Sequence, residues 1–416
     1  MRTDVAIVGG GPGGTAAAVY LGRAGISSVI VEKQSFPRFH IGESLTGECG
    51  NLLREIGLED EMSAMGNPIK YGVKVLGPSG ANSFFIPVKK RVPDVGLQDT
   101  FTWQVRRADF DRMLLDKAVE GGSTPLAGRA VAPLMDDDQR VRGVRVELEG
   151  GEMVDIESEV VIDASGQHTF LANAGVTSRK ERGNYDRQLA LYSHFTGAQR
   201  DPGDGSGNTL IFYQRPHHWA WFIPIDDKVD SIGVVVPSEY FQSKGESKRD
   251  FLRREMGSLN PDLTARVGEV EMVEDVHASS NYSYHVKEFS GRGWLCVGDA
   301  HRFIDPIFSF GVHISMAEGK MAAGAIERYL AGEGRELDRP FADFERAAER
   351  GIDVFQSLLD GFWENSLAFP ILVHQRYPED FIDMFAGRVY VDHEYDGLRA
   401  IRKVLARSRG EMPVPT

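Results

Sequence analysis

The sequence predicts an α/β fold with an inserted β-sheet domain and a helical C-terminal region. Three observations predict it. A glycine-rich turn joins an apolar strand at 4–8 to an Ala-rich helix at 14–24, and a second apolar strand follows at 28–32. Apolar strands that end in small or acidic residues return at 160–166 and 294–300. Between these pieces, alternating apolar runs are broken by Gly, Pro and Asn, which is typical of strands and turns.

The remaining elements follow in chain order. A helix is expected at 47–56, strand-like sequence at 69–105, a helix at 107–122 and a strand meander at 129–163. Further strands are expected at 188–197, 209–214, 218–225 and 231–237, and further helices near 247–257 and at 312–332 and 341–363. The division we predict is a discontinuous nucleotide-binding domain (1–66, 103–178 and 286–330), a β-rich substrate domain (67–102 and 179–285) and a helical C-terminal region or lid (331–416).

Composition excludes several classes of protein. The 416 residues are 42% hydrophobic and 26% charged, which is ordinary for a globular chain. The net charge of −14 argues against a nucleic-acid binder. No stretch approaches the roughly twenty apolar residues of a membrane span, and the N-terminus lacks the pattern of a signal peptide, so we expect a soluble, cytoplasmic protein. The cysteines, Cys49 and Cys296, and the 11 histidines show no metal-ligand spacing, so no metal is expected.

The turn after the first strand has the pattern GxGxxG, formed by Gly9, Gly11 and Gly14. The first glycine permits the tight turn, the second lets backbone approach a pyrophosphate, and the third lets helix and strand pack closely. The pyrophosphate would lie at the helix N-terminus, where free N–H groups favour an anion. Glu32 ends the second strand about twenty residues later and would accept a ribose hydroxyl. An acid there disfavours a 2′-phosphate, which leaves NAD or FAD.

Three later residues stand at the ends of expected elements. Asp163 and Asp299 end two strands, and Arg107 precedes a helix. Each taken alone is an ordinary turn residue. Together with the glycine turn they resemble the Rossmann-like FAD-binding domain of the glutathione-reductase type, as found in aromatic hydroxylases, over about residues 1–330. The cofactor-binding residues that this resemblance implies are Gly9, Gly11, Gly14, Glu32, Lys33, Arg38, Ser44, Arg107, Asp299 and Gly311.

A second motif narrows the family. Trp219 and Trp221 lie on one face of an expected strand that ends at Pro224, giving WxWxIP. Such a pair alone would be read as core packing. As a unit, however, WxWxIP resembles the hallmark of flavin-dependent halogenases. In that family the segment lies beside the passage from flavin to substrate and is not catalytic.

The same resemblance identifies Lys70 as the catalytic residue. It follows a Gly42-Glu43-Ser44 segment and precedes Tyr71, as the family pattern requires, while Lys74 is the competing candidate. The resemblance implies that a flavin hydroperoxide oxidises chloride or bromide to a hypohalous acid such as HOCl. A buried ammonium would then direct this oxidant to an aromatic carbon. The alternative is a solvated strand lysine.

The segment 305–313 is the implied halide site, with the backbone N–H groups of Phe310 and Gly311 as donors. Tryptophan-specific members carry a glutamate where this chain has Phe308, a residue of the implied substrate passage. We therefore expect an electron-rich phenol or pyrrole as substrate, and carrier-protein tethering is one hypothesis. The sequence Asp163-Ala164-Ser165-Gly166 lacks the aspartate-glycine signature linked to nicotinamide recognition. Reduced FAD is therefore expected from a separate flavin reductase.

Other functions share this fold. An FAD-dependent aromatic monooxygenase, a prenyl-chain reductase and a non-enzymatic flavoprotein all stay open, because one scaffold hosts many reactions. WxWxIP and Lys70 favour the halogenase, an oxidoreductase of natural-product biosynthesis.

Overall fold

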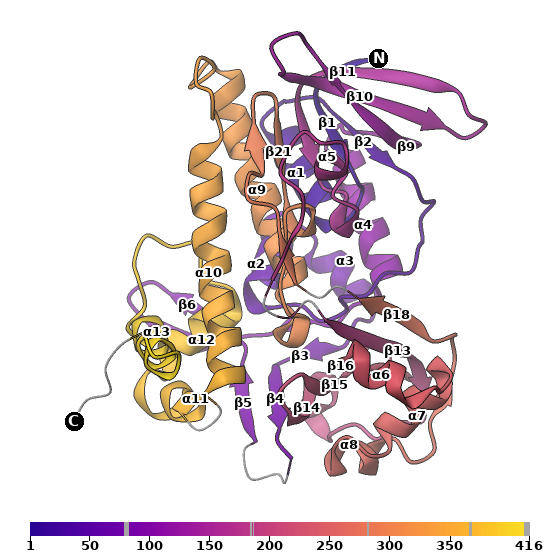
Figure 1. The fold of residues 1–416 in the computed structure, drawn as a ribbon, viewed down its shortest axis with the longest axis vertical. Coiled ribbons are helices and arrows are strands. Elements are labelled where there is room, and N and C mark those ends of the chain that lie inside the picture. Colours follow the sequence, from indigo (N-terminus) through magenta and orange to yellow (C-terminus); the bar gives the residue numbers. More distant parts are fainter. Residues whose placement is uncertain (79–82, 184, 186, 281–282, 366–367, 412–416) are drawn as a thin grey trace.

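Two large β-sheets and a group of long helices organise the chain (Figure 1). The structure is a computed structural model that describes residues 1–416 except 79–82, 184, 186, 281–282, 366–367 and 412–416. The first sheet contains the glycine-rich turn, and the second contains the WxWxIP strand. The long C-terminal helices stand beside both.

The first sheet is the predicted nucleotide-binding layer. Strand β1 lies between β2 and β11, β2 continues to β9, and β11 continues to β21, all in parallel. The far ends of β9, β10 and β11 form an antiparallel meander, as expected. The strands are β1 (Arg2–Val8), β2 (Ser28–Glu32), β9 (Thr124–Met135), β10 (Val141–Leu148), β11 (Met153–Asp163), β20 (Ser290–Gly291) and β21 (Trp294–Cys296). Two strands end earlier than predicted, at Asp163 and Cys296, because the small residues after them form turns.

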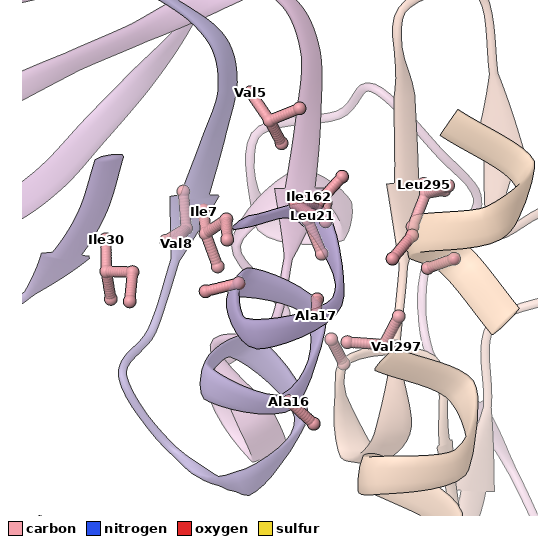
Figure 2. Packing of buried hydrophobic residues seen from close by; sticks show 14 of the residues in the cluster. Val5, Ile7, Val8, Ala16, Ala17, Leu21, Ile30, Ile162, Leu295 and Val297 are labelled. Atoms are coloured by element: carbon pink, nitrogen blue, oxygen red, sulfur yellow. The ribbon is translucent and has the colours of Figure 1, made fainter. Parts of the chain in front are cut away.

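Helix α1 (Pro12–Arg23) packs between this sheet and α9 (Gly311–Leu330). It begins two residues before the predicted start, because Pro12 supplies a preset backbone angle at a helix N-terminus. Its small side chains allow close packing, and Figure 2 shows them in one apolar cluster with the neighbouring strands, which includes Ile7, Ala16, Ala17, Leu21, Ile162, Leu295 and Val297.

The second sheet brings together strands from distant parts of the chain. Its order is β17-β13-β16-β15-β14-β4-β5, with β18 beside β13. Its strands are β4 (Gly72–Leu76), β5 (Phe84–Pro87), β13 (Gln188–Thr196), β14 (Thr209–Arg215), β15 (His218–Pro224), β16 (Val229–Pro237), β17 (Glu271–Met272) and β18 (His277–Ser280). The four strand-like runs predicted between 188 and 237 are thus confirmed. Helices α6 (Ser238–Lys244), α7 (Lys248–Met256) and α8 (Pro261–Arg266) lie beside this sheet in Figure 1, and only α7 was predicted.

Shorter strands and helices complete the fold. The short strands are β3 (Ile69–Lys70), β6 (Lys89–Val92), β7 (Gly96–Asp99), β8 (Thr102–Trp103), β12 (Glu181–Arg182), β19 (Tyr284–His285) and β22 (Arg302–Phe303). The further helices are α2 (Gly47–Glu55), α3 (Glu59–Ala64), α4 (Arg107–Glu120), α5 (Phe170–Asn173), α10 (Ala342–Glu364), α11 (Ala368–Ile371), α12 (Pro378–Ala386) and α13 (Asp396–Ser408). The C-terminal helices share an aromatic core with the second sheet. The division into three domains stays a prediction.

Two kinds of feature are absent from the described residues. No helix among them combines the length and the apolar character needed to cross a membrane. Nor do His, Cys, Asp or Glu side chains gather there in a group of three or more suited to a metal ion. Cys49 and Cys296 are buried free thiols.

The contact between α1 and α9 can be tested at a single glycine. A Cβ added at Gly319 would lie 2.5 Å from the carbonyl oxygen of Gly13, so Gly319→Ala should force the helices apart. We expect a loss of about 1–3 kcal/mol in the free energy of unfolding, measured by urea denaturation. Gly324→Ala, on the same helix, is the control. Its nearest neighbour is 3.8 Å away, so it should stabilise the helix by about 0.5–1 kcal/mol. Equal stability of the two variants would contradict this packing.

Candidate functional site

A cavity of about 690 Å³ opens where β1, β2 and β21 end. The structure places most of the predicted cofactor residues on its wall, although they come from six separate parts of the sequence. The predicted residues on the wall are Gly9, Gly11, Glu32, Lys33, Arg38, Ser44, Arg107, Asp299 and Gly311. Trp219 and Trp221 line the same cavity. A cavity this large and long suits a dinucleotide.

The glycine turn has the geometry that a close backbone approach requires. Gly9 has a φ of +110°, and a Cβ there would meet the carbonyl oxygen of Ala164 at 2.4 Å. Gly14 does not line the cavity; a Cβ on it would lie 2.1 Å from the oxygen of Gly9, so its role is packing. Gly11 faces open space, with only Arg38 near, at 3.7 Å from a built Cβ. This divides the three glycines as the motif predicts.

Glu32 lies directly beside this turn. One carboxylate oxygen accepts the N–H of Gly10 at 2.9 Å, and the other accepts the N–H of Gln34 at 2.9 Å. Both bonds fix the carboxylate at the rim of the cavity, where it can still accept a ribose hydroxyl through remaining lone pairs. Asp163, by contrast, is fully buried and does not line the cavity. Its carboxylate accepts the N–H groups of Ser165 and Leu171, which makes it a structural residue of the adjoining turn.

Two arginines supply positive charge to the cavity. Arg107 donates two hydrogen bonds to Asp111, at 2.8 and 3.0 Å, and a third to the carbonyl of Ile41 at 2.6 Å. Arg38 donates to the same Asp111 at 3.1 Å, and its buried Nε atom has no hydrogen-bond partner among the described residues. Asp111 is completely buried. Sequence reasoning did not single out Asp111, although its position one helical turn after Arg107 was an available signal.

These features fit FAD. A glycine turn and a helix N-terminus suit the pyrophosphate, and the two arginines add complementary positive charge. The unpaired Nε of Arg38 can donate a hydrogen bond to a phosphate oxygen. At the other end, the cavity wall changes to aromatic and apolar side chains, including Trp219, Trp221 and Ile223. That end suits a flat, largely apolar ring system.

Lys70 lies next to this aromatic end. It occupies β3, which pairs with β8, and its side chain is only 1% exposed. Its Nζ donates to the hydroxyl of Ser44 and to the carbonyl of Leu45, both at 2.8 Å. Burial lowers the pKa of this amine to about 7. Within the described residues, no carboxylate forms an ion pair with it.

Lys74 differs from Lys70 in its exposure and in its ion pairing. Its side chain is 39% exposed and pairs with Asp201 at 3.3 Å. It is the solvated strand lysine that the sequence left as an alternative for Lys70. The structure thus separates the two candidates by burial.

A second, much smaller cavity of about 20 Å³ has Lys70 on its wall. Lys70 lines it together with Phe308 and Phe385, whose rings are 4.9 Å apart. Ser44, the hydrogen-bond partner of Lys70, lines the large cavity instead. Lys70 therefore stands between the two spaces. The predicted substrate-passage residues divide the same way: Trp219 and Trp221 face the large cavity, and Phe308 faces the small one.

The predicted halide donors lie at the start of α9. The first hydrogen bond of this helix runs from the N–H of Ile314 to the carbonyl of Phe310, at 2.9 Å. The N–H groups of the preceding turn therefore have no partner within the helix. Gly311 lines the large cavity, whereas the ring of Phe310 stacks on Phe355 at 4.0 Å, outside the cavity wall. A backbone anion site here stays a prediction.

Comparisons with known proteins agree with this geometry. A family model described as an FAD binding domain matches residues 2–339. The 1H-pyrrole-2-carbonyl peptidyl-carrier protein brominase of Pseudoalteromonas luteoviolacea is 38% identical over 86% of this chain and 85% of its own. The corresponding chlorinase of Pseudomonas fluorescens is 28% identical over 99% of this chain and 98% of its own. The solved structure of the flavin-dependent brominase Bmp2 aligns with a TM-score of 0.92 at 35% identity, covering 99% of this chain and all of that one (100%).

Asp111 offers a direct test of the cofactor site. Asp111→Asn removes the charge shared by Arg38 and Arg107, so both guanidinium groups lose their fixed positions. We expect FAD affinity to fall at least about tenfold, since charge-assisted bonds contribute about 1.5–3 kcal/mol each. Quenching of flavin fluorescence measures it. Asp116→Asn is the control, because Asp116 lies on the same helix in an exposed pair with Arg112. Equal affinities in the two variants would contradict the assigned role of Asp111.

Proposed function

This chain is an FAD-binding enzyme of the flavin-dependent halogenase family, and from that premise we propose that it halogenates a pyrrole-2-carbonyl group carried on a peptidyl carrier protein. The cofactor is FAD, and the second substrate is a halide. The carrier-bound pyrrole is supported by the two relatives named for it, which match this chain over most of their length.

The observation that carries the proposal is the position of Lys70. Burying an amine without a carboxylate partner costs folding free energy, so such a group indicates a functional role. It stands between a cavity that fits FAD and a second cavity lined by aromatic rings. Neither a hydroxylase nor a prenyl-chain reductase needs an amine at this position.

The residues around Lys70 define what it can do. Reduced FAD and O2 supply the oxidising power that converts halide into an electrophilic halogen species. Ser44 and the carbonyl of Leu45 hold the Lys70 amine at the boundary of the two cavities. Because its pKa is about 7, the amine can act near neutral pH either as a hydrogen-bond donor or as a nucleophile toward that species. The amine itself is only 1% exposed, which limits the access of bulk water to any oxidant held beside it.

The small cavity supports an electron-rich ring as the substrate. Among its described lining residues, Lys70 is the one titratable group, and the others are apolar or neutral. Phe308 stands where tryptophan-specific members carry a carboxylate. A ring bound there must be reactive without help from a carboxylate, because Asp and Glu are absent from the described lining residues, and pyrrole meets this condition. The cavity has room for about one water molecule, so Phe308 and Phe385 must shift to admit a ring.

We also propose that a separate flavin reductase supplies the reduced cofactor. The turn after β11 reads Ala164-Ser165-Gly166, and no second dinucleotide motif is visible in the sequence. Purified protein would then halogenate only when a reductase and NADH are added.

Lys70→Ala tests the proposed function. We expect no halogenated product from carrier-bound pyrrole-2-carbonyl with FAD, a flavin reductase, NADH, O2 and bromide or chloride, while FAD binding is retained. Intact-protein mass spectrometry detects the product by its halogen isotope pattern. Lys74→Ala is the matched control and should keep wild-type turnover within about twofold, since Lys74 makes only a surface ion pair. Halogenation by the Lys70 variant, or oxygen insertion without halide, would contradict the proposal.

A further inference from the structure

Three titratable side chains form a continuous chain behind the glycine-glutamate-serine segment. Oε1 of Glu43 lies 2.6 Å from Nε2 of His194, and Nδ1 of His194 lies 2.8 Å from Oε1 of Glu274. Glu43 and His194 are 1% and 2% exposed. Both imidazole nitrogens are thus held by carboxylates, an arrangement that fixes the ring in position.

The chain of groups runs from the cofactor cavity to the protein surface. Glu43 lines the large cavity, and its second oxygen, Oε2, is buried with no hydrogen-bond partner in the part of the chain that the structure describes. Glu43 is also adjacent to Ser44, so it lies at the same end of the cavity as Lys70. At the outer end the side chain of Glu274 is 33% exposed. The backbone around Glu274 is fixed, because Ser193 donates its hydroxyl to the carbonyl of Glu274 at 2.9 Å.

Halogenation needs a supply of protons. The balanced reaction is FADH2 + O2 + X⁻ + ArH + H⁺ → FAD + ArX + 2 H2O. O2 accepts four electrons in all. Two come from the reduced flavin, and two come from the halide and the arene as they combine into ArX. One proton from outside is consumed in each turnover. Lys70 and Glu43 are each only 1% exposed, so bulk water does not reach either side chain directly, and a chain of protein groups offers that proton a route.

We propose that Glu274, His194 and Glu43 form a proton-transfer path that carries this proton from solvent to the reaction chamber. Glu274 takes up a proton at the surface and passes it to Nδ1 of His194. The imidazolium then releases the proton on Nε2 to Oε1 of Glu43. Rotation of the Glu43 carboxyl group presents the proton to the cavity, where it is consumed. The ring must then exchange its Nδ1 proton for one on Nε2, which requires rotation about the Cβ–Cγ bond and proton exchange with water, before the starting tautomer is restored.

The electrostatic surroundings suit this role. Burial alone would lower the pKa of His194, yet the hydrogen bonds and charges of Glu43 and Glu274 raise it above its ordinary value. Burial and the charge of Glu43 raise the pKa of the neighbouring Tyr192 to about 12, so Tyr192 does not compete for the proton near neutral pH. His277 lies 3.5 Å from the outer oxygen of Glu274. On the other side, β16 places the uncharged Ser231 opposite His194.

The ring of Phe39 shields the middle of the path. It lies 5.6 Å from the ring of His194 and stacks on His277 at 3.9 Å. Bulk water therefore reaches Glu274 but not His194 directly. The alternative is that the three groups merely anchor the segment around Glu43 to the second sheet. The proton path rests on halogenation itself and not on the carrier-bound pyrrole, so it can fail while the proposed function stands.

The first test uses the FAD-free protein. In ¹⁵N-histidine NMR, the resonances of His194 are assigned by their loss in His194→Gln. Glu43→Gln and Glu274→Gln should each lower the pKa of His194, because each removes a negative charge that stabilises the imidazolium. A pKa of His194 that neither substitution changes would overturn the path, since the three groups would not share a proton.

The second test uses the loaded enzyme. His194→Ala should slow product formation in a single turnover at least about tenfold, release hydrogen peroxide instead, and regain activity as imidazole is added. The FAD affinity and melting temperature of His194→Ala are measured as well. Both should stay near wild type if His194 transfers protons, and both should fall if it only anchors the Glu43 segment. His301→Gln, at another buried His–Glu pair that does not line the cavity, is the control, and imidazole should not rescue any loss it causes.

The outcomes are distinct. A His194→Ala enzyme that is slow, binds FAD normally and recovers with imidazole supports the path. A variant with wild-type rate, or one whose loss follows FAD affinity and ignores imidazole, overturns it. If the wild type itself forms no halogenated product, the proposed function fails instead, while the NMR result still decides whether the three groups share a proton.

Discussion

The site is organised around one buried amine. Lys70 keeps its amine away from bulk water, and no described carboxylate neutralises it. Removing an ammonium group from water costs several kcal/mol unless it is hydrogen-bonded or loses its proton. Here the compensation is two short bonds, to Ser44 and to the carbonyl of Leu45, together with a pKa near neutrality. An amine held this way stays reactive, which a salt-bridged surface lysine such as Lys74 does not.

Segments far apart in the sequence converge to build this environment. Ser44 also bonds Thr209 at 2.8 Å, and Thr209 accepts a hydrogen bond from Gln104 at 2.8 Å. Gly207 leaves no space for a side chain, because a Cβ there would meet the carbonyl oxygen of Ile69 at 2.0 Å. The WxWxIP strand closes the neighbouring cavity with two indole rings 5.9 Å apart. The first sheet thus presents the cofactor, and the second sheet supplies the wall against which the amine is buried.

Local signals explain what the sequence could predict. The glycine turn, Glu32 and Arg107 each belong to a short motif beside a predictable strand or helix, and the structure brings them to one cavity. The motif favours Lys70 over Lys74, and Lys70 is the buried one of the two. The contacts that the sequence did not predict join residues far apart in the chain. His194 meets Glu43 across 151 residues and Glu274 across 80, and no local pattern signals such contacts. Likewise, the spacing of Trp219, Trp221 and Phe308 gave no sign that they face two different cavities.

The most direct test of this account is the protonation of the Lys70 amine in the folded protein. Lysine labelled with ¹³C at Cε gives one NMR signal for each side chain, and Lys70→Met identifies the signal of residue 70. This signal should titrate with a pKa of about 7, because burial disfavours the charged form of the amine. A titration near the ordinary value of 10.5, like that of an exposed lysine, would show that the amine lies in water and would contradict the central claim.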